Sequence, residues 1–181
     1  MTLIERLVAV HEALNQSNTP HAFGGAIALA YCTQEPRGTR DIDVNVFVDV
    51  AEAKAVLDAL PEGVVIDEAN REQIRRGGQT RLTWGDTPLD LFFNVDDFHR
   101  EVAARTRTVP FARTSIPILD CATLTVFKAM FSRPKDWVDI ATMLECDTID
   151  ATFALGWITR LVGHDHESTR RLAELIRDAA T

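Results

Sequence analysis

Several features that would assign this chain to a common class are missing from its 181 residues. Its three cysteines form no CxxC pair, so neither a disulfide framework nor a zinc knuckle is expected. No apolar run is long enough to span a membrane. The first residues carry Glu5 and Arg6 within their apolar pattern, which argues against a signal peptide. The expected location is therefore a reducing cytoplasm.

The chain also lacks an excess of positive charge. Its formal net charge of −8 argues against an all-over nucleic-acid-binding surface, although a local basic patch remains compatible with it. There is no GxxxxGK phosphate loop, no internal repeat and no low-complexity segment. The length and the 46% content of hydrophobic residues suit one domain, or one domain with a small helical extension.

The most informative stretch runs from Asp41 to Val48. Its apolar residues alternate, as is typical of a half-buried β-strand: Ile42, Val44, Val46 and Val48. A period of two places Asp41, Asp43 and Asn45 together on the other face. Neighbouring carboxylates raise each other's proton affinity unless a cation lies between them. We interpret Asp41 and Asp43 as the start of a Mg²⁺ site.

Two other interpretations of this stretch were weighed. The simpler one is a strand whose solvent face is acidic, since short DxD strings arise often by chance. The other is an EF-hand calcium loop, whose ligand positions match Asp41, Asp43, Asn45, Asp49 and Glu52. That loop needs glycine at its sixth position, where this chain has Val46. The alternating β-branched residues also favour a strand over a loop.

A third carboxylate is expected on a later strand. Thr80–Trp84 and Pro88–Phe93 have the pattern of a β-hairpin around Gly85-Asp86. In the second arm Leu89, Leu91 and Phe93 share one face, and Asp90 projects from the other. A lone charge on an apolar strand is costly unless it is paired or bound to a metal. The preceding segment, 71–81, is rich in arginine and contains Gly77-Gly78, which predicts a basic, mobile segment.

Adjacent glycines at Gly24-Gly25 precede a predicted short helix from Ala26 to Tyr31. Glycines let the backbone approach a bound group closely, and a helix start points N–H groups outward. By itself such a pair usually means only a tight turn. Together with three carboxylates that can hold one or two divalent ions, the turn fits metal-assisted transfer from a nucleoside triphosphate. Mg²⁺ suits such a site, because it prefers a few carboxylates, waters and substrate phosphate oxygens.

These motifs resemble the polymerase-β-like nucleotidyltransferase superfamily. The resemblance lies in Gly24-Gly25, in the stretch Arg37-Gly-Thr-Arg-Asp-Ile-Asp-Val44 and in Leu89-Asp90-Leu91. Downstream, Lys128 and the string Arg133-Pro-Lys-Asp136-x-x-Asp139 resemble the toxin branch, which includes AbiE-type toxins and the MenT-type toxins that modify tRNA. The resemblance covers roughly residues 20–140.

The family implies an α/β (α+β) nucleotidyltransferase fold with a mixed, mostly antiparallel sheet flanked by helices. We expect residues 1–119 to form the catalytic core. From Asp120 the sequence becomes helical, and we expect residues 120–181 to form a C-terminal helical subdomain packed on that core.

The resemblance also implies roles for individual residues. Asp41 and Asp43 would bind the metals, and Asp90 would complete the site and help deprotonate the attacking hydroxyl. Gly24 and Gly25 would cradle the triphosphate, with Thr39 or Arg40 nearby. Lys128 would contact the β and γ phosphates. Asp136 and Asp139 would support Lys128 or the nucleotide. For Lys128 an equal alternative is a surface lysine over an apolar face. For Asp136 and Asp139 we prefer a solvated helix face with a Lys135–Asp139 pair.

The function implied is a Mg²⁺-dependent toxin of a toxin–antitoxin pair. It would transfer a nucleotide from an NTP to the 3′ end of tRNA and release pyrophosphate. Two arginine clusters, within 71–81 and 100–113, could follow an RNA backbone. Three alternatives stay open: transfer to an aminoglycoside or other small molecule, transfer to a protein, and a catalytically silent binding module that keeps the fold.

Overall fold

The computed structural model describes residues 1–180, which form two compact units. The first unit comprises residues 1–25 and 38–118, and the second comprises 26–37 and 119–181. Within residues 1–180 no helix is both long enough and apolar enough to cross a membrane.

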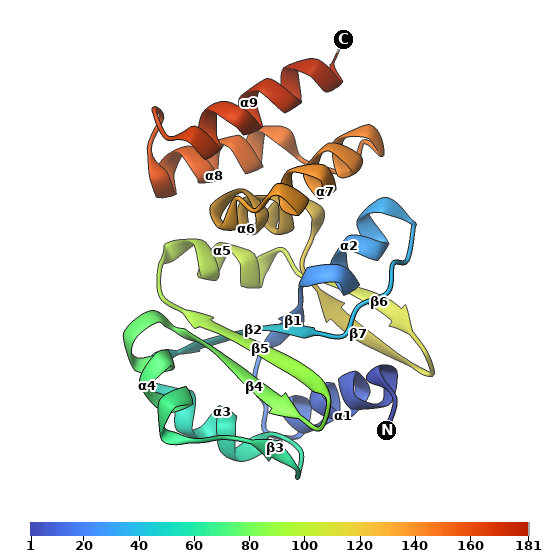
Figure 1. Cartoon of the computed structure of the whole chain (residues 1–181), viewed down its shortest axis with the longest axis vertical. Coiled ribbons are helices and arrows are strands. Elements are labelled where there is room, and N and C mark those ends of the chain that lie inside the picture. The colour runs from blue at the N-terminus through green and yellow to red at the C-terminus, as the bar shows by residue number, and fades with distance from the viewer. Residues whose placement is uncertain (181) are drawn as a thin grey trace. The chain divides into compact units, whose positions relative to one another are not determined.

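The first unit is built on a seven-stranded sheet (Figure 1) with the strand order β3-β4-β5-β2-β1-β7-β6. The strands are β1 (His21–Phe23), β2 (Ile42–Asp49), β3 (Val64–Val65), β4 (Gln79–Trp84), β5 (Thr87–Asn94), β6 (Arg107–Phe111) and β7 (Thr114–Ile118). The pairs β2–β5 and β1–β7 are parallel, and the other four are antiparallel. The expected mixed, mostly antiparallel sheet is therefore confirmed.

Helices lie on both sides of this sheet. They are α1 (Leu3–Gln16), α3 (Ala53–Ala59), α4 (Glu68–Gly77) and α5 (Asp97–Ala104), with a 3₁₀ turn at Val50–Glu52. Figure 1 shows α1 and α3 on one side and α5 on the other. The helix α1 begins at a capping box, in which Thr2 and Glu5 bond each other's backbone N–H groups.

The central strands follow the alternation seen in the sequence. Ile42, Val44 and Val46 of β2 are at most 1% exposed. Leu89, Leu91 and Phe93 of β5 are equally buried. Because side chains alternate along a strand, the polar residues between them must face the opposite side of the sheet. This second face carries Asp43 of β2, Asp90 of β5 and Arg81 of β4.

The segment 71–81, predicted to be basic and mobile, is regular secondary structure, with α4 at its start and β4 at its end. Residues 68–77 form α4, which begins at an Asp67–Asn70 capping box and ends at Gly78 in the left-handed conformation. Its arginines are paired within the helix, since Arg75 bonds Glu68 and Glu72, and Arg76 bonds Glu72. The prediction of mobility gave the two glycines too much weight and missed these pairs.

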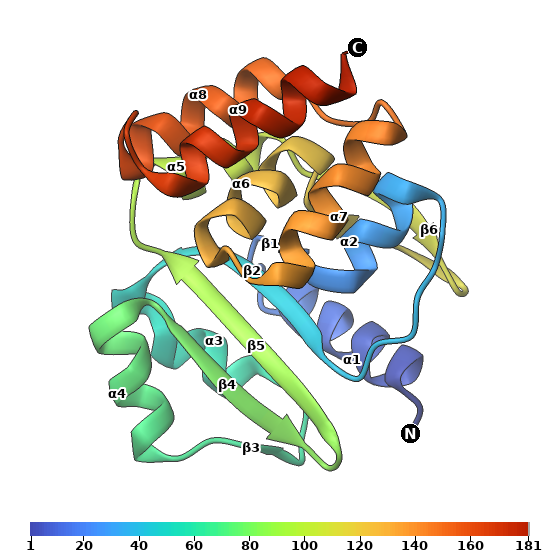
Figure 2. The same ribbon diagram turned by 45° about the horizontal axis from the view of Figure 1, so that its top comes forward.

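The second unit is helical (Figure 2). It holds α2 (Gly25–Thr33) from Ala26 onward, and α6 (Cys121–Phe131), α7 (Pro134–Glu145), α8 (Ala151–Val162) and α9 (Glu167–Ala179). The helix α6 is capped by Asp120, whose carboxylate accepts the N–H of Thr123. The interior side chains of the bundle include Val126, Trp137, Ile140, Met143, Ala154, Ile158 and Leu172.

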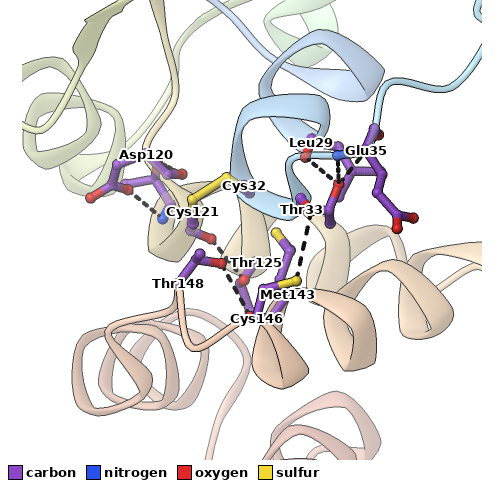
Figure 3. Close-up of a disulfide and its surroundings, with 11 residues drawn as sticks. Leu29, Cys32, Thr33, Glu35, Asp120, Cys121, Thr125, Met143, Cys146 and Thr148 are labelled. Carbon is purple, nitrogen blue, oxygen red and sulfur yellow. Dashed lines mark hydrogen bonds between the residues drawn. A yellow bond between two sulfur atoms is a disulfide. The ribbon is translucent and has the colours of Figure 1, made fainter.

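A disulfide joins Cys32 at the end of α2 to Cys121 at the start of α6 (Figure 3). The expectation that no disulfide forms is therefore wrong. The two residues are 89 positions apart with Cα atoms 5.6 Å apart, so spacing alone gave no sign of the pairing. The third cysteine, Cys146, is a free and exposed thiol that donates to the carbonyl of Thr33 at 3.8 Å.

Candidate active site

The second face of β2 places acidic residues in a row along the strand. Asp43 lies between the buried Ile42 and Val44, so its carboxylate faces away from the core. Asp41 immediately precedes the strand and is 42% exposed at its side chain. Its backbone N–H donates to the hydroxyl of Thr39 at 3.2 Å, which fixes the chain where it enters β2. Arg40, which lies between Thr39 and Asp41 in the sequence, is exposed.

Asp90 lies beside Asp43 on the neighbouring strand. The two residues are register partners in the parallel pair β2–β5, so both carboxylates project from the same face of the sheet. Asp90 lies between the buried Leu89 and Leu91, and its own side chain is only 13% exposed. The structure thus brings the predicted carboxylates of two separate strands together, as the alternation in the sequence requires.

A guanidinium compensates these carboxylates. Arg81 of β4 is the register partner of Asp90 on the strand's other side and donates to both of its oxygens, at 2.7 and 2.6 Å. It also lies 3.7 Å from Oδ2 of Asp41. The hydrogen bonds and charge of Asp90, with the charges of Asp41 and Asp43, raise the pKa of Arg81 above its ordinary value. One cation therefore faces all three carboxylates.

The paired-glycine turn closes over Asp43. The N–H of Gly24, directly after β1, donates to the carbonyl of Asp43 at 2.9 Å. Gly25 has φ of +51°, and a β-carbon there would lie 1.8 Å from Oδ2 of Asp43. Only glycine meets both conditions without displacement of the carboxylate. The turn is thus fitted to Asp43 and is more than a chain reversal.

The donor set fits a hard divalent cation. Asp41, Asp43 and Asp90 offer only carboxylate oxygens, which Mg²⁺ prefers, and Arg81 already places a positive charge among them. Among residues 1–180, however, no three His, Cys, Asp or Glu side chains are arranged as a metal-binding group. Asp90 and Asp41 contact the guanidinium of Arg81, and the role of the three carboxylates as metal ligands remains a prediction.

A second charged cluster lies in the helical unit. The ammonium of Lys128 in α6 donates to Asp139 at 2.6 Å and to Asp136 at 3.4 Å, both on α7. All three side chains are at most 7% exposed. The surface-lysine alternative for Lys128 is therefore wrong, and so is the preferred solvated face for Asp136 and Asp139. A spacing of three residues puts two carboxylates on one helix face, but it does not show what covers that face.

Two arginines complete this cluster. Arg37 donates to both oxygens of Asp139, at 2.6 and 3.0 Å, and Arg133 donates to both oxygens of Asp136. Burial alone would raise the pKa of Asp136, but the hydrogen bonds from Arg133 and the charges of Lys128 and Arg133 outweigh it, so that this pKa lies below its usual range. Asp136 is therefore charged at neutral pH and paired, and Asp139 is paired with Lys128 and Arg37.

The sequence interpretation missed Arg37, Arg81 and Arg133 as partners of these carboxylates. The signal for Arg81 was available, because its hairpin position opposite Asp90 follows from a turn at Gly85-Asp86. The signal for Arg133 was its position three residues before Asp136 at a helix start. No local pattern links Arg37 to Asp139, which is 102 residues away.

The sheet with its facing carboxylates and glycine turn has the architecture of nucleotidyltransferases. The chain resembles the crystal structure of ANT(2″)-Ia in complex with adenylyl-2″-tobramycin, with a TM-score of 0.59 at 12% identity over 100% of both chains. It also resembles an antigenic nucleotidyltransferase-like protein from Paracoccidioides brasiliensis, with a TM-score of 0.51 at 15% identity over 96% of this chain and 88% of that one. Among curated protein sequences none matches the chain.

The family itself is defined by the sequence. The model of the AbiEii family, described as nucleotidyl transferase AbiEii toxin of a type IV toxin–antitoxin system, matches residues 8–180. The chain belongs to this family and is a nucleotidyltransferase of the toxin branch, as its motifs predict. The fold predicted from the sequence is also confirmed by the solved structures.

Proposed function

We propose that this protein is a cytoplasmic, Mg²⁺-dependent toxin that transfers a nucleotide from an NTP to the 3′ end of tRNA, under the control of an antitoxin. One observation supports the proposal most strongly. Asp43 and Asp90 project side by side from one face of the sheet, and the glycine turn at Gly25 lies directly against Asp43. The family membership supports the toxin role.

In this proposal the residues of the site have separate roles in the reaction. Asp41, Asp43 and Asp90 would hold the divalent ion, which when bound stabilises the charge of the transferring phosphoryl group. Asp90 would accept the proton of the attacking hydroxyl. Backbone N–H groups at Gly24 and Gly25 would bind phosphate oxygens, because no side chain obstructs them. In the predicted core of residues 1–119, Thr39 and Arg40 would border this site.

The cluster around Lys128 supports nucleotide binding less directly. The predicted helical subdomain, residues 120–181, would supply Lys128 to the β and γ phosphates and Asp136 to its support. In the structure both carboxylates that face Lys128 also carry an arginine, so the lysine is not their only counter-charge. The ammonium can therefore exchange a carboxylate for a phosphate oxygen without leaving Asp136 or Asp139 unpaired.

The arginine distribution favours an RNA acceptor on one edge of the sheet. The arginines of α4 are neutralised by Glu68 and Glu72. In contrast, Arg113 is exposed in the turn of the β6–β7 hairpin, and β6 is an edge strand. An RNA backbone bound there would give strongly salt-dependent affinity.

A labelling assay tests the proposal. The protein is incubated with Mg²⁺ and each labelled NTP, with tRNA, an aminoglycoside or a protein extract as the acceptor. We expect label on tRNA, reduced by about 100-fold or more in Asp43→Asn because a metal ligand is lost. Asp58→Asn, an exposed carboxylate on α3, is the matched control and should label normally.

The other acceptors decide between the alternatives. Label on the aminoglycoside alone would replace the tRNA proposal by a small-molecule one, for which the likeness to ANT(2″)-Ia and the acidic net charge are the favouring observations. Label on protein alone would indicate a protein-modifying enzyme. No label on any acceptor would contradict the proposed activity.

A further inference from the structure

The three predicted metal ligands, Asp41, Asp43 and Asp90, form a carboxylate row that already has a cation beside it, the guanidinium of Arg81. Arg81, Asp90 and Asp43 are consecutive register partners across β4, β5 and β2, so their side chains lie side by side on one face of the sheet. The guanidinium holds Asp90 with two hydrogen bonds and also reaches Asp41. The groups that would bind a divalent ion are thus already engaged by a side chain of the same molecule.

We propose that Arg81 is the internal counter-cation of the Asp41–Asp43–Asp90 site, which it occupies before the metal and leaves when a divalent ion binds. This inference rests on the proposed function, because it takes these carboxylates to be the metal ligands. It adds that metal binding is a competition with Arg81, so the metal affinity of the protein is lower than its three carboxylates alone would give.

The charge balance explains why such a residue is needed. Three carboxylates on neighbouring positions repel one another, and Asp90, at 13% exposure, has little water to screen its charge. Without a metal, a fixed positive charge offsets this repulsion. The bidentate geometry of a guanidinium suits a single carboxylate, and its charge reaches the others.

The exposure of Arg81 explains how it can leave. Its side chain is 60% exposed, so a released guanidinium is solvated by water, and the pair with Asp90 contributes only modestly to stability. A divalent ion brings twice the charge to the same oxygens. By contrast, a buried arginine could not be exchanged in this way without leaving an uncompensated charge.

Divalent metal affinity tests the inference directly, measured on the full-length protein by calorimetric titration with Mn²⁺ alone. We expect Arg81→Gln to bind Mn²⁺ roughly tenfold more tightly than the wild type, because the competing hydrogen bonds are gone. Arg81→Lys keeps the charge but loses the bidentate pair, so we expect an intermediate affinity. Thermal unfolding of each variant establishes that it is folded.

Two further variants make the result specific. Arg76→Gln removes the same charge from α4, where the arginine pairs with Glu72, and should leave Mn²⁺ affinity unchanged. Adding Asp43→Asn to Arg81→Gln should abolish the gain, which locates the ion at the carboxylate row. Equal affinities of Arg81→Gln and Arg76→Gln would overturn the inference and leave an ordinary cross-strand ion pair.

Weaker Mn²⁺ binding by Arg81→Gln would also overturn the inference, since Arg81 would then orient Asp90 as a ligand. Failure of the proposed function is a separate observation, namely no transfer of label to any acceptor by the wild type. A protein that transfers label while Arg81→Gln gains no Mn²⁺ affinity would refute the role of Arg81 alone.

Discussion

A β-carbon at position 25 would lie 1.8 Å from Oδ2 and 2.5 Å from Cγ of Asp43, well inside van der Waals contact. The backbone at Gly25 is also left-handed. At the residue scale, therefore, the position of the central carboxylate depends on the absence of a neighbouring side chain. Any residue other than glycine must either move Asp43 or open the turn after β1.

The variant Gly25→Ala tests this dependence. We expect nucleotidyl transfer to fall to the level of Asp43→Asn, because the carboxylate can no longer keep its place beside Asp90. We also expect the free energy of unfolding to fall by at least about 1 kcal/mol, since alanine is strained at this φ. Labelling and thermal unfolding measure the two effects.

Gly77→Ala is the control for this variant. It lies at the end of α4, where an added β-carbon meets nothing within 4 Å, and alanine favours the helix. Its stability should be unchanged or slightly higher. If Gly25→Ala behaved like Gly77→Ala in both measurements, the turn would have no part in positioning Asp43.

At the scale of the elements, α6 and α7 are joined by a buried charged cluster. Lys128 is at most 7% exposed and faces two carboxylates that are buried as well. Removing Lys128 takes a buried hydrogen-bond donor and a positive charge from both carboxylates, although Arg37 and Arg133 still pair with them. Arg37 and Arg133, at the edge of the cluster, reduce the loss of stability but do not abolish it.

We expect Lys128→Met to lower the free energy of unfolding by about 3 kcal/mol, measured by urea denaturation. Lys135→Met, an exposed lysine on α7, should change it by no more than about 0.5 kcal/mol. Adding Asp139→Asn to Lys128→Met should cost less than the sum of the two single changes, because they remove one interaction. Additive costs would show that the lysine and Asp139 are independent.

The sequence predicted the strands whose hydrophobic residues alternate clearly. It did not predict features that depend on residues far away in the chain. The alternation around Asp43 and Asp90 predicted two strands and the shared face of the sheet, and the structure contains both. The burial of Asp136 and Asp139 was missed, since it depends on what covers one face of α7. A spacing of three says only that the two side chains are neighbours.

The lack of a local signal also explains why the disulfide between Cys32 and Cys121 was not predicted. Cys32 and Cys121 are 89 residues apart, and neither has a neighbour in the sequence that marks it. Their Cα atoms come within 5.6 Å only in the folded helical unit, which no local pattern reveals. The catalytic roles predicted for Asp41, Asp43, Asp90 and Lys128 remain predictions, because a fold and a charge pattern constrain chemistry without measuring it.

At the scale of the whole molecule, stability should depend on pH through a pair of buried histidines. Nδ1 of His11 lies 2.9 Å from Nε2 of His21, and the outer nitrogens bond Asn15 and the carbonyl of Thr19. Only neutral rings satisfy this chain of hydrogen bonds. Burial, chiefly, lowers the pKa of both histidines below their ordinary 6.5.

The direction of the pH effect follows from these lowered pKa values. Between the folded and the unfolded pKa the unfolded chain binds more protons, so stability rises with pH and is lost as pH falls below the unfolded value of 6.5. We therefore expect a lower unfolding temperature at about pH 5.5 than at about pH 7.5. In His11→Gln with His21→Gln this difference should shrink, and an unchanged difference would exclude the pair as its source.

The bond between Cys32 and Cys121 makes a covalent ring of the chain between them, and that ring contains β2, β4 and β5 with every carboxylate of the row. A protease that cuts once at any exposed point between these cysteines opens the ring but releases no fragment. Such a nicked protein should migrate as one species in a denaturing gel until a reductant is added, when it should separate into two pieces.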